Sequence, residues 1–319
     1  MASSYQVQFG IEAPYKLKYP NRRIVEEIVH HDGVNFFTVY FPVLESVPIR
    51  GRLILLHGWS EHSGMYYRLM ESLTSLGYSC FIYDQRGSGR TSLGAERGIV
   101  GATKEVTLTD LDRMIEHFQS VTKESGTDQE TLPLGIVGHS MGGGIALSYL
   151  SEGKYRNIIS SCLVNSPLVK PHKCLAPCIV ILYIGYLGAY LFPNWKYSQN
   201  ETTQDSNDVE DVTTSEEWKQ YLNTELMCRD GGTLRQLVQM LDRGLSLLKS
   251  DYSIGKTTRV MILQPKNDRI TNSEATEQLY NNIDVDDKVL VHLPGRHALF
   301  IETDDNYAEV CACLEKFYS

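Results

Sequence analysis

The chain has 319 residues, of which 42% are hydrophobic and 22% charged, so it can bury one large core or one core that carries an inserted subdomain. Its formal net charge of −9 argues against nucleic-acid binding, which needs a basic footprint. Seven cysteines, an odd number in a long chain, argue against a disulfide framework. The N-terminal residues lack the apolar stretch of a secretory signal, so we expect an intracellular protein that is not secreted.

The first predicted element is a β-hairpin over Glu26–Phe41, with its turn at Asp32-Gly33. Six short apolar runs rich in β-branched residues follow, and such runs are typical of parallel strands covered on both faces. These runs are Arg52–Leu56, Ser79–Tyr83, Leu134–Gly138, Ser161–Asn165, Arg259–Gln264 and Lys288–Leu293.

Segments with helical periodicity separate most of these runs. Alternating strands and helices predict a mostly parallel, doubly wound α/β sheet, here in one domain over residues 1–319. The predicted helices are Tyr66–Leu76, Leu108–Val121, Gly142–Leu150, Thr233–Lys249, Asn272–Ile283 and Asn306–Phe317.

The alternation of strands and helices stops after Ser166-Pro167. From about residue 168 to 232 the chain is first apolar, then acidic, then helical, and no strand pattern is evident. We therefore expect an inserted, largely helical cap or lid on top of the sheet.

The pentapeptide from Gly138 to Gly142 has the pattern G-x-S-x-G, with Ser140 at its centre. It lies directly between a predicted strand and a predicted helix, the context in which this pattern forms the nucleophile turn of an α/β-hydrolase fold. The glycines leave room for the neighbouring strand and helix, and the amides of the helix N-terminus face the site. The sequence therefore predicts Ser140 as a nucleophile.

Two backbone amides are candidates for an oxyanion hole. His57-Gly58-Trp59 follows the first core strand, and Met141 follows the candidate nucleophile. The amides of Trp59 and Met141 would hold the negative oxygen of a tetrahedral intermediate, whereas the alternative for the first loop is an ordinary strand-to-helix turn.

A serine hydroxyl needs a histidine base and an acid that orients it, and in this fold they follow the serine in the order acid, then histidine. His297 lies in a loop beyond the last predicted strand, where a base is expected. His172 falls in the insertion and His292 within a strand. Asp268 lies just past the preceding strand and is the expected acid. Other candidates, before strands or in solvated turns, are Asp251, Asp284, Asp286 and Asp287.

With these residues assembled, the chain resembles the monoacylglycerol lipase family, and within it the fungal enzymes. The resemblance implies hydrolysis of a monoacylglycerol to glycerol and a fatty acid, with no metal or organic cofactor. It also implies that Glu61 and His139 line the pocket for the alcohol; for Glu61 the alternative is a carboxylate that orders its loop. The matching stretches are HGWSEHSGMYYRL (57–69), YDQRGSGRTS (83–92), GHSMGGGIAL (138–147), GGTLRQLVQMLDRG (231–244), QPKNDRIT (264–271) and PGRHALF (294–300).

This sequence departs from the family pattern at Trp59, where many relatives carry a small residue, and at Met65, where the animal enzymes are expected to carry arginine. These departures leave the preferred ester open. A lysophospholipase or a broad-specificity carboxylesterase is the nearest alternative. A non-catalytic lipid-binding protein on a hydrolase scaffold is more distant, because all three triad candidates are present.

The segment 179–192 is apolar nearly all round, with tyrosines at helical spacing. A mobile lid that touches lipid and a cap helix packed on the core are competing interpretations, whereas a membrane-spanning helix would interrupt the domain. We expect this segment to contact a membrane or lipid-droplet surface peripherally. The expected location is therefore cytoplasmic, on lipid droplets or endomembranes.

Overall fold

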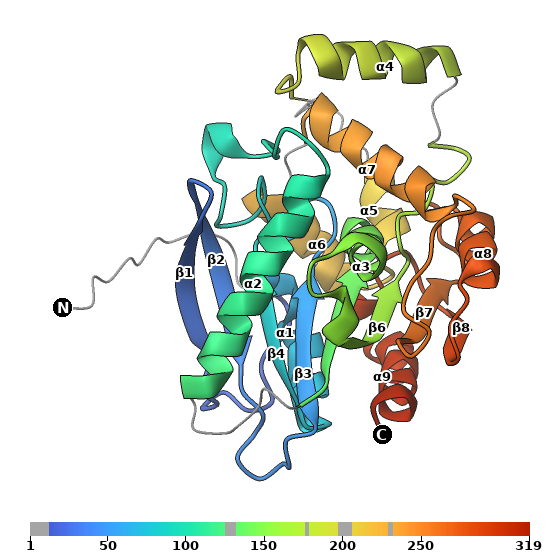
Figure 1. Ribbon diagram of the computed structural model, residues 1–319. Coiled ribbons are helices and arrows are strands. Elements are labelled where there is room, and N and C mark those ends of the chain that lie inside the picture. The colour runs from blue at the N-terminus through green and yellow to red at the C-terminus, as the bar shows by residue number, and fades with distance from the viewer. Residues whose placement is uncertain (1–12, 125–131, 176–178, 197–205, 229–231) are drawn as a thin grey trace.

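The computed structural model describes residues 13–124, 132–175, 179–196, 206–228 and 232–319 (Figure 1). Its eight-stranded sheet has the strand order β1-β2-β4-β3-β5-β6-β7-β8, in which β3 to β8 run parallel and β1 and β2 pair antiparallel. The strands are β1 (Val25–His31), β2 (Val34–Phe41), β3 (Gly51–Leu56), β4 (Tyr78–Tyr83), β5 (Leu134–His139), β6 (Ile159–Asn165), β7 (Arg259–Pro265) and β8 (Lys288–Leu293).

The predicted mostly parallel, doubly wound sheet is confirmed, and so is the hairpin that precedes it. Asp32 and Gly33 connect β1 to β2 with φ angles of 48° and 72°. Aspartate tolerates this left-handed region and glycine enters it freely, which explains the tight turn between the two strands.

Helices cover both faces of the sheet and form two hydrophobic core clusters. On one face the apolar sides of α2, α3, α7 and α8 pack together, and on the other α1 and α9 pack on the sheet. The predicted Leu108–Val121 helix is three residues longer at each end, because the added residues are mostly polar and do not continue the apolar periodicity. These helices are α1 (Tyr67–Ser75), α2 (Glu105–Glu124), α3 (Met141–Glu152), α7 (Leu234–Leu247), α8 (Ser273–Asn282) and α9 (Asp304–Tyr318).

Between β6 and β7 the described residues form no strand of the sheet, and the chain passes through α4 (Ile179–Leu191), α5 (Ser206–Val212) and α6 (Glu216–Thr224) before α7. In Figure 1, α4 lies across α7 at the top of the molecule. Of the expected cap, residues 176–178, 197–205 and 229–231 lie outside the described residues, and part of its acidic stretch lies there too.

The first turn of α3 packs against the sheet so closely that only glycine fits at two positions. A Cβ atom at Gly142 would lie 2.2 Å from the backbone oxygen of Leu56, and one at Gly138 would lie 2.5 Å from the backbone oxygen of Gly142. Both distances are far below van der Waals contact, so the two glycines of the G-x-S-x-G pattern set how near α3 comes to β3 and β5.

We expect Gly142→Ala to lower the free energy of unfolding by about 3 kcal/mol, the upper end of the usual cost of overpacking, because its methyl group meets backbone atoms that cannot rotate away. Urea denaturation of the purified variant measures this loss. Gly185→Ala in α4 is the matched control: its Cβ meets nothing within 4 Å, so it should be neutral or stabilising by up to about 1 kcal/mol. A Gly142→Ala protein as stable as the wild type would contradict the close packing.

Candidate active site

Ser140 occupies the sharp turn between β5 and α3. Its φ of 50° and ψ of −114° are strained for a residue with a side chain. Three backbone hydrogen bonds hold this conformation: its amide donates to the carbonyl of Asn165 at 3.0 Å, and its carbonyl accepts from Gly144 at 3.0 Å and from Leu168 at 2.9 Å. The surrounding backbone therefore fixes the strained turn.

Asp268 and His297, from the loops after β7 and β8, are in contact. Nδ1 of His297 lies 3.1 and 3.2 Å from the two carboxylate oxygens of Asp268, and both side chains are buried. The backbone amides of Ile270 and Thr271 donate to Asp268 at 2.8 and 2.9 Å, and the Thr271 hydroxyl and the Gln264 side chain also donate to it. Burial opposes the charge of Asp268, but His297 and the two Thr271 donors lower the pKa of its carboxyl well below the usual value.

The structure brings Ser140 and His297 to the same end of the sheet through β6. Asn165, the last residue of β6, accepts the Ser140 amide, and the hydroxyl of Ser166 donates to the His297 carbonyl at 2.6 Å. Among the described contacts, no hydrogen bond joins the Ser140 hydroxyl to the His297 ring. Such bonds are often long in unliganded sites and tighten when substrate binds.

The amides of Trp59 and Met141 lie in adjacent segments, because Gly142 packs against the backbone oxygens of Leu56 and His57. Neither amide donates a hydrogen bond to another described residue. The Met141 amide lies at the N-terminus of α3, where the helix dipole favours a negative charge. Both donors are therefore available to an anion.

Buried hydrogen bonds of His57 order the loop that carries Trp59. The amide of Gln85 donates to His57 Nε2 at 2.9 Å, so the ring proton is on Nδ1 and is donated to the Gly58 carbonyl at 2.7 Å. The Gln85 side chain also donates to the His57 carbonyl at 2.7 Å. His57 therefore acts as a structural part of this loop.

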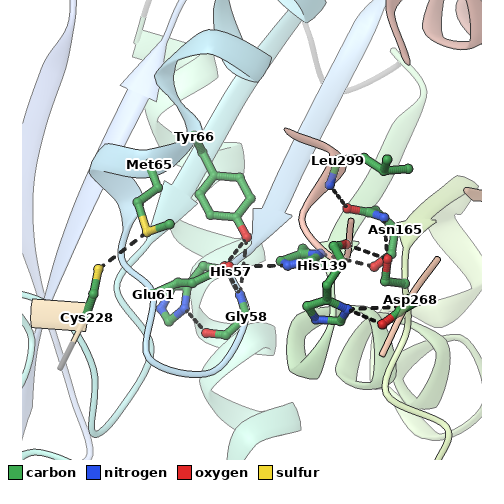
Figure 2. Close-up of polar contacts among 12 residues, drawn as sticks. His57, Gly58, Glu61, Met65, Tyr66, His139, Asn165, Cys228, Asp268 and Leu299 are labelled. Atoms are coloured by element: carbon green, nitrogen blue, oxygen red, sulfur yellow. Dashed lines mark hydrogen bonds and ion pairs between the residues drawn. The ribbon is translucent and has the colours of Figure 1, made fainter. Parts of the chain in front are cut away.

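Glu61 forms a buried pair with His139, next to Ser140 in the chain. Glu61 Oε1 lies 3.3 Å from His139 Nε2, while Oε2 accepts from the Gly58 amide at 2.6 Å and from the Tyr66 hydroxyl at 2.5 Å (Figure 2). Burial opposes both charges, but the attraction between them and these hydrogen bonds lower the pKa of Glu61 to about 2 and raise the pKa of His139. Both oxygens of Glu61 thus already have protein partners.

The His139 ring also lies against His297, with 4.8 Å between the ring centroids, and its Nδ1 is 3.3 Å from the Asn165 carbonyl. The Glu61–His139 pair is therefore in contact with the Asp268–His297 pair. Two carboxylate–histidine pairs lie side by side at this end of the sheet.

Trp59 and Met65 both contact the insertion or its return helix. The Trp59 indole donates to the Gln236 side chain in α7 at 3.3 Å. Met65 is buried, and its sulfur lies 3.7 Å from the thiol of Cys228. Burial raises the pKa of Cys228 well above its ordinary value, so this thiol stays protonated at neutral pH.

Sequence reasoning missed Asn165 and Ser166. The Asn165 side chain donates to Ser166 at 2.6 Å and accepts from the Leu299 amide at 3.2 Å, so it ties β6 to the segment after His297. The available signal was their position: polar residues at the carboxyl end of a central parallel strand lie at the edge where ligands bind.

Replacing Glu61 by glutamine tests the buried pair through its pH dependence. Since the pKa of Glu61 is lowered, the Glu61 charge contributes to the free energy of unfolding above pH 4.5, the ordinary pKa of the group. This contribution is lost as the pH falls toward 2. Since the pKa of His139 is raised, the His139 charge contributes fully to the free energy of unfolding below pH 6.5, the ordinary pKa of the group. This contribution is lost as the pH rises through the pKa of the folded state.

The free energy of unfolding should therefore differ most between wild type and Glu61→Gln from pH 4.5 to 6.5, by about 3 kcal/mol, and the gap should narrow at higher and lower pH. Urea denaturation at a series of pH values measures it, with the exposed Glu96→Gln as the control. A difference that does not change with pH would rule out a charged pair.

A search for relatives finds monoglyceride lipases. The Saccharomyces cerevisiae monoglyceride lipase is 29% identical over 310 residues, which cover 92% of this chain and 92% of the relative. The human monoglyceride lipase is 26% identical over 271 residues, covering 85% of this chain and 82% of that protein.

Solved structures agree on the fold. A soluble variant of the Saccharomyces cerevisiae monoglyceride lipase, in complex with a substrate analog, superposes with a TM-score of 0.82 at 28% identity, over 96% of each chain. The Paleococcus ferrophilus monoacylglycerol lipase, at 20% identity and a TM-score of 0.69, covers 89% of this chain and 98% of that one, and shares the fold. The expected α/β-hydrolase fold is thus confirmed. Residues 47–304 match the family model described as "Serine aminopeptidase, S33", and the chain belongs to this family of serine hydrolases.

Proposed function

We propose that this chain is a carboxylic ester hydrolase that cleaves monoacylglycerols to glycerol and a fatty acid, with Ser140 as the nucleophile. The observation that carries the proposal is the strained Ser140 turn at the sheet edge where His297 meets Asp268. The monoglyceride lipases among its relatives support the lipid substrate. The family description names a peptidase, so amide substrates belong in the test.

The proposed mechanism uses an acyl-enzyme. Nε2 of His297 removes the hydroxyl proton as Ser140 attacks the ester carbonyl, and the Asp268 carboxylate stabilises the imidazolium that forms. The amides of Trp59 and Met141 bind the oxyanion, and each such donor contributes about 3 kcal/mol to lowering the barrier. His297 then protonates the departing glycerol oxygen, and water repeats these steps on the acyl-enzyme.

Glu61 and His139 are proposed to line the alcohol side of the site. Glu61 hydrogen-bonds Gly58, directly before the Trp59 amide, and His139 directly precedes Ser140. Because both oxygens of Glu61 have protein partners, its primary effect is to order this loop and to hold the His139 ring in place. Nε2 of His139 faces Glu61 and Nδ1 faces the Asn165 carbonyl, so the ring has a fixed orientation beside Ser140.

The α4 segment is proposed to contact a membrane or lipid-droplet surface from the cytoplasmic side. α4 contains no charged residue, and Ile184, Leu187, Tyr190 and Leu191 are 64%, 59%, 83% and 55% exposed. Tyr186 faces the other way and donates to Asp242 of α7 at 2.5 Å, which attaches the helix to the fold. Among the described helices, none is long and apolar enough to cross a bilayer. An apolar face of this kind suits the lipid interface.

The Ser140→Ala variant should lose hydrolysis of a long-chain monoacylglycerol by at least about 1,000-fold and lose labelling by a fluorophosphonate probe, since no nucleophile remains. Its unfolding midpoint should stay close to that of the wild type. Retained turnover in a purified sample would refute Ser140 as the nucleophile.

The wild type, assayed beside this variant, should prefer the monoacylglycerol over a lysophospholipid, a p-nitrophenyl ester and a peptide p-nitroanilide. A preference for the lysophospholipid would assign the alternative lysophospholipase activity, and equal use of all the esters would assign a broad carboxylesterase. A wild type that hydrolyses none of them would revive the lipid-binding scaffold.

Changing Ile184, Leu187 and Leu191 together to serine should weaken binding to phosphatidylcholine vesicles at least tenfold, since each side chain removes on the order of 1 kcal/mol of apolar burial. Turnover of a short, soluble p-nitrophenyl ester should not change. Ile158→Ser, which alters an exposed apolar residue away from α4, is the control for vesicle binding. Unchanged binding of the triple variant would remove α4 from the lipid contact.

A further inference from the structure

Glu302 is a buried carboxylate beside the loop that carries His297. It follows the short helix η6 (Leu299–Ile301) and is only 1% exposed. One carboxylate oxygen accepts the Arg296 amide at 2.7 Å, directly before His297 in the chain. The same oxygen packs against Gly295, where a Cβ would lie 3.1 Å away and where φ is 115°. Glu302 therefore holds the turn that leads into His297.

The same carboxylate also holds the insertion. The Thr214 amide lies 3.1 and 3.2 Å from the two Glu302 oxygens, and the Thr214 hydroxyl donates to one of them. The amide of Thr303 and the side-chain nitrogen of Asn306 each lie 3.3 Å from the second oxygen. Every one of these partners donates, so the site requires a group that accepts on both oxygens.

The insertion contacts the histidine loop a second time through its backbone. The His297 amide donates to the Asp211 carbonyl at 3.2 Å, and the Ala298 amide donates to the Val212 carbonyl at 2.8 Å. The amides of residues 296, 297 and 298 are thus all fixed by Glu302 or by the end of α5. The position of the His297 backbone depends on a segment that is not part of the sheet.

On its other side Glu302 is anchored to the core. Nη1 of Arg68 in α1 donates to the Glu302 carbonyl at 2.7 Å, and Nη2 pairs with Asp304 at 2.6 Å. The Arg68 guanidinium also stacks on the Tyr307 ring, 3.8 Å from its centroid. Because the Glu302 backbone is fixed to the core in this way, its side chain holds both Arg296 and Thr214 in place relative to the core.

We propose that Glu302 is a positioning residue that couples the docked segment 211–214 of the insertion to the orientation of His297. The inference rests on the proposed function, in which His297 is the general base. Glu302 touches no reacting atom and acts through the backbone of residues 296–298. The His297 side chain is then correctly oriented only when segment 211–214 of the insertion is docked against Glu302.

The first test is Glu302→Gln, which keeps the shape of the side chain but places an NH₂ group against the N–H and O–H groups that donate to Glu302. We expect kcat on a monoacylglycerol to fall about 10- to 100-fold, because a small displacement of a catalytic group has effects of this size. KM should stay within about twofold, since the substrate contacts are not altered. Glu309→Gln, an exposed change on α9, is the control and should leave kcat unchanged. A folded Glu302→Gln protein with wild-type kcat, or with a change in KM alone, would overturn the proposal.

A second pair of variants applies even if Glu302→Gln fails to fold. Thr214 is exposed, and Thr214→Val removes the hydroxyl that donates to Glu302 and accepts from Asn306, whereas Thr214→Ser retains it. We expect the valine variant to lower kcat several-fold and the serine variant to restore it. In the double variant of Glu302→Gln and Thr214→Val, kcat should be no lower than in Glu302→Gln alone, because both changes break one contact. Equal kcat values for valine and serine, or additive losses, would count against the coupling.

The wild type separates failure of this inference from failure of the proposed function. If the wild type hydrolyses no ester and does not react with a fluorophosphonate, the proposed function itself fails. If the wild type is active and the variants at positions 302 and 214 match it, only the positioning of His297 by Glu302 is wrong.

Discussion

Where β5 ends and α3 begins, the backbone atoms of three segments approach so closely that a side chain at position 138 or 142 would collide with them. This contact forces Ser140 into its strained turn and brings the Met141 amide beside the loop after β3. It also directs the first turn of a buried, apolar helix at the sheet edge. The strain persists because hydrogen bonds from β6 and from the start of the insertion hold both ends of the turn.

Around this fixed point, buried carboxylates order the loops. Asp268 accepts hydrogen bonds from the amides of its own loop and contacts His297. Glu61 accepts from the Gly58 amide, directly before Trp59, and pairs with His139. Glu302 binds both the histidine loop and the insertion. Each is buried, and burial of a charge is unfavourable unless it is satisfied by donors. Each carboxylate therefore requires its loop to present several N–H or O–H groups at once, and this specifies the loop conformation.

The insertion contributes two different surfaces. Its inner segments are bound to the fold through polar contacts near Thr214 and by Arg97, which donates to the carbonyls of Leu226 and Met227. Its outer helix, α4, carries apolar side chains that no described part of the protein covers. The insertion therefore has one side that is bound to the loop of His297 and another side whose apolar residues are exposed.

The sequence by itself determined the parallel sheet, the hairpin before it and the strand-turn-helix around Ser140. It did so because periodicity, turn residues and required glycines are local signals. The sequence also identified Asp268 and His297 as the candidate acid and base, because parallel strands end at one edge of the sheet and the loops that follow them lie close together there. Only the tertiary structure decided that both Glu61 oxygens have protein partners, that His139 lies against His297, and that Glu302 binds Thr214. These contacts join residues 78, 158 and 88 positions apart. No local pattern encodes such pairings, because they depend on which loops meet at the sheet edge and, for Glu302 and Thr214, on where the insertion contacts that edge.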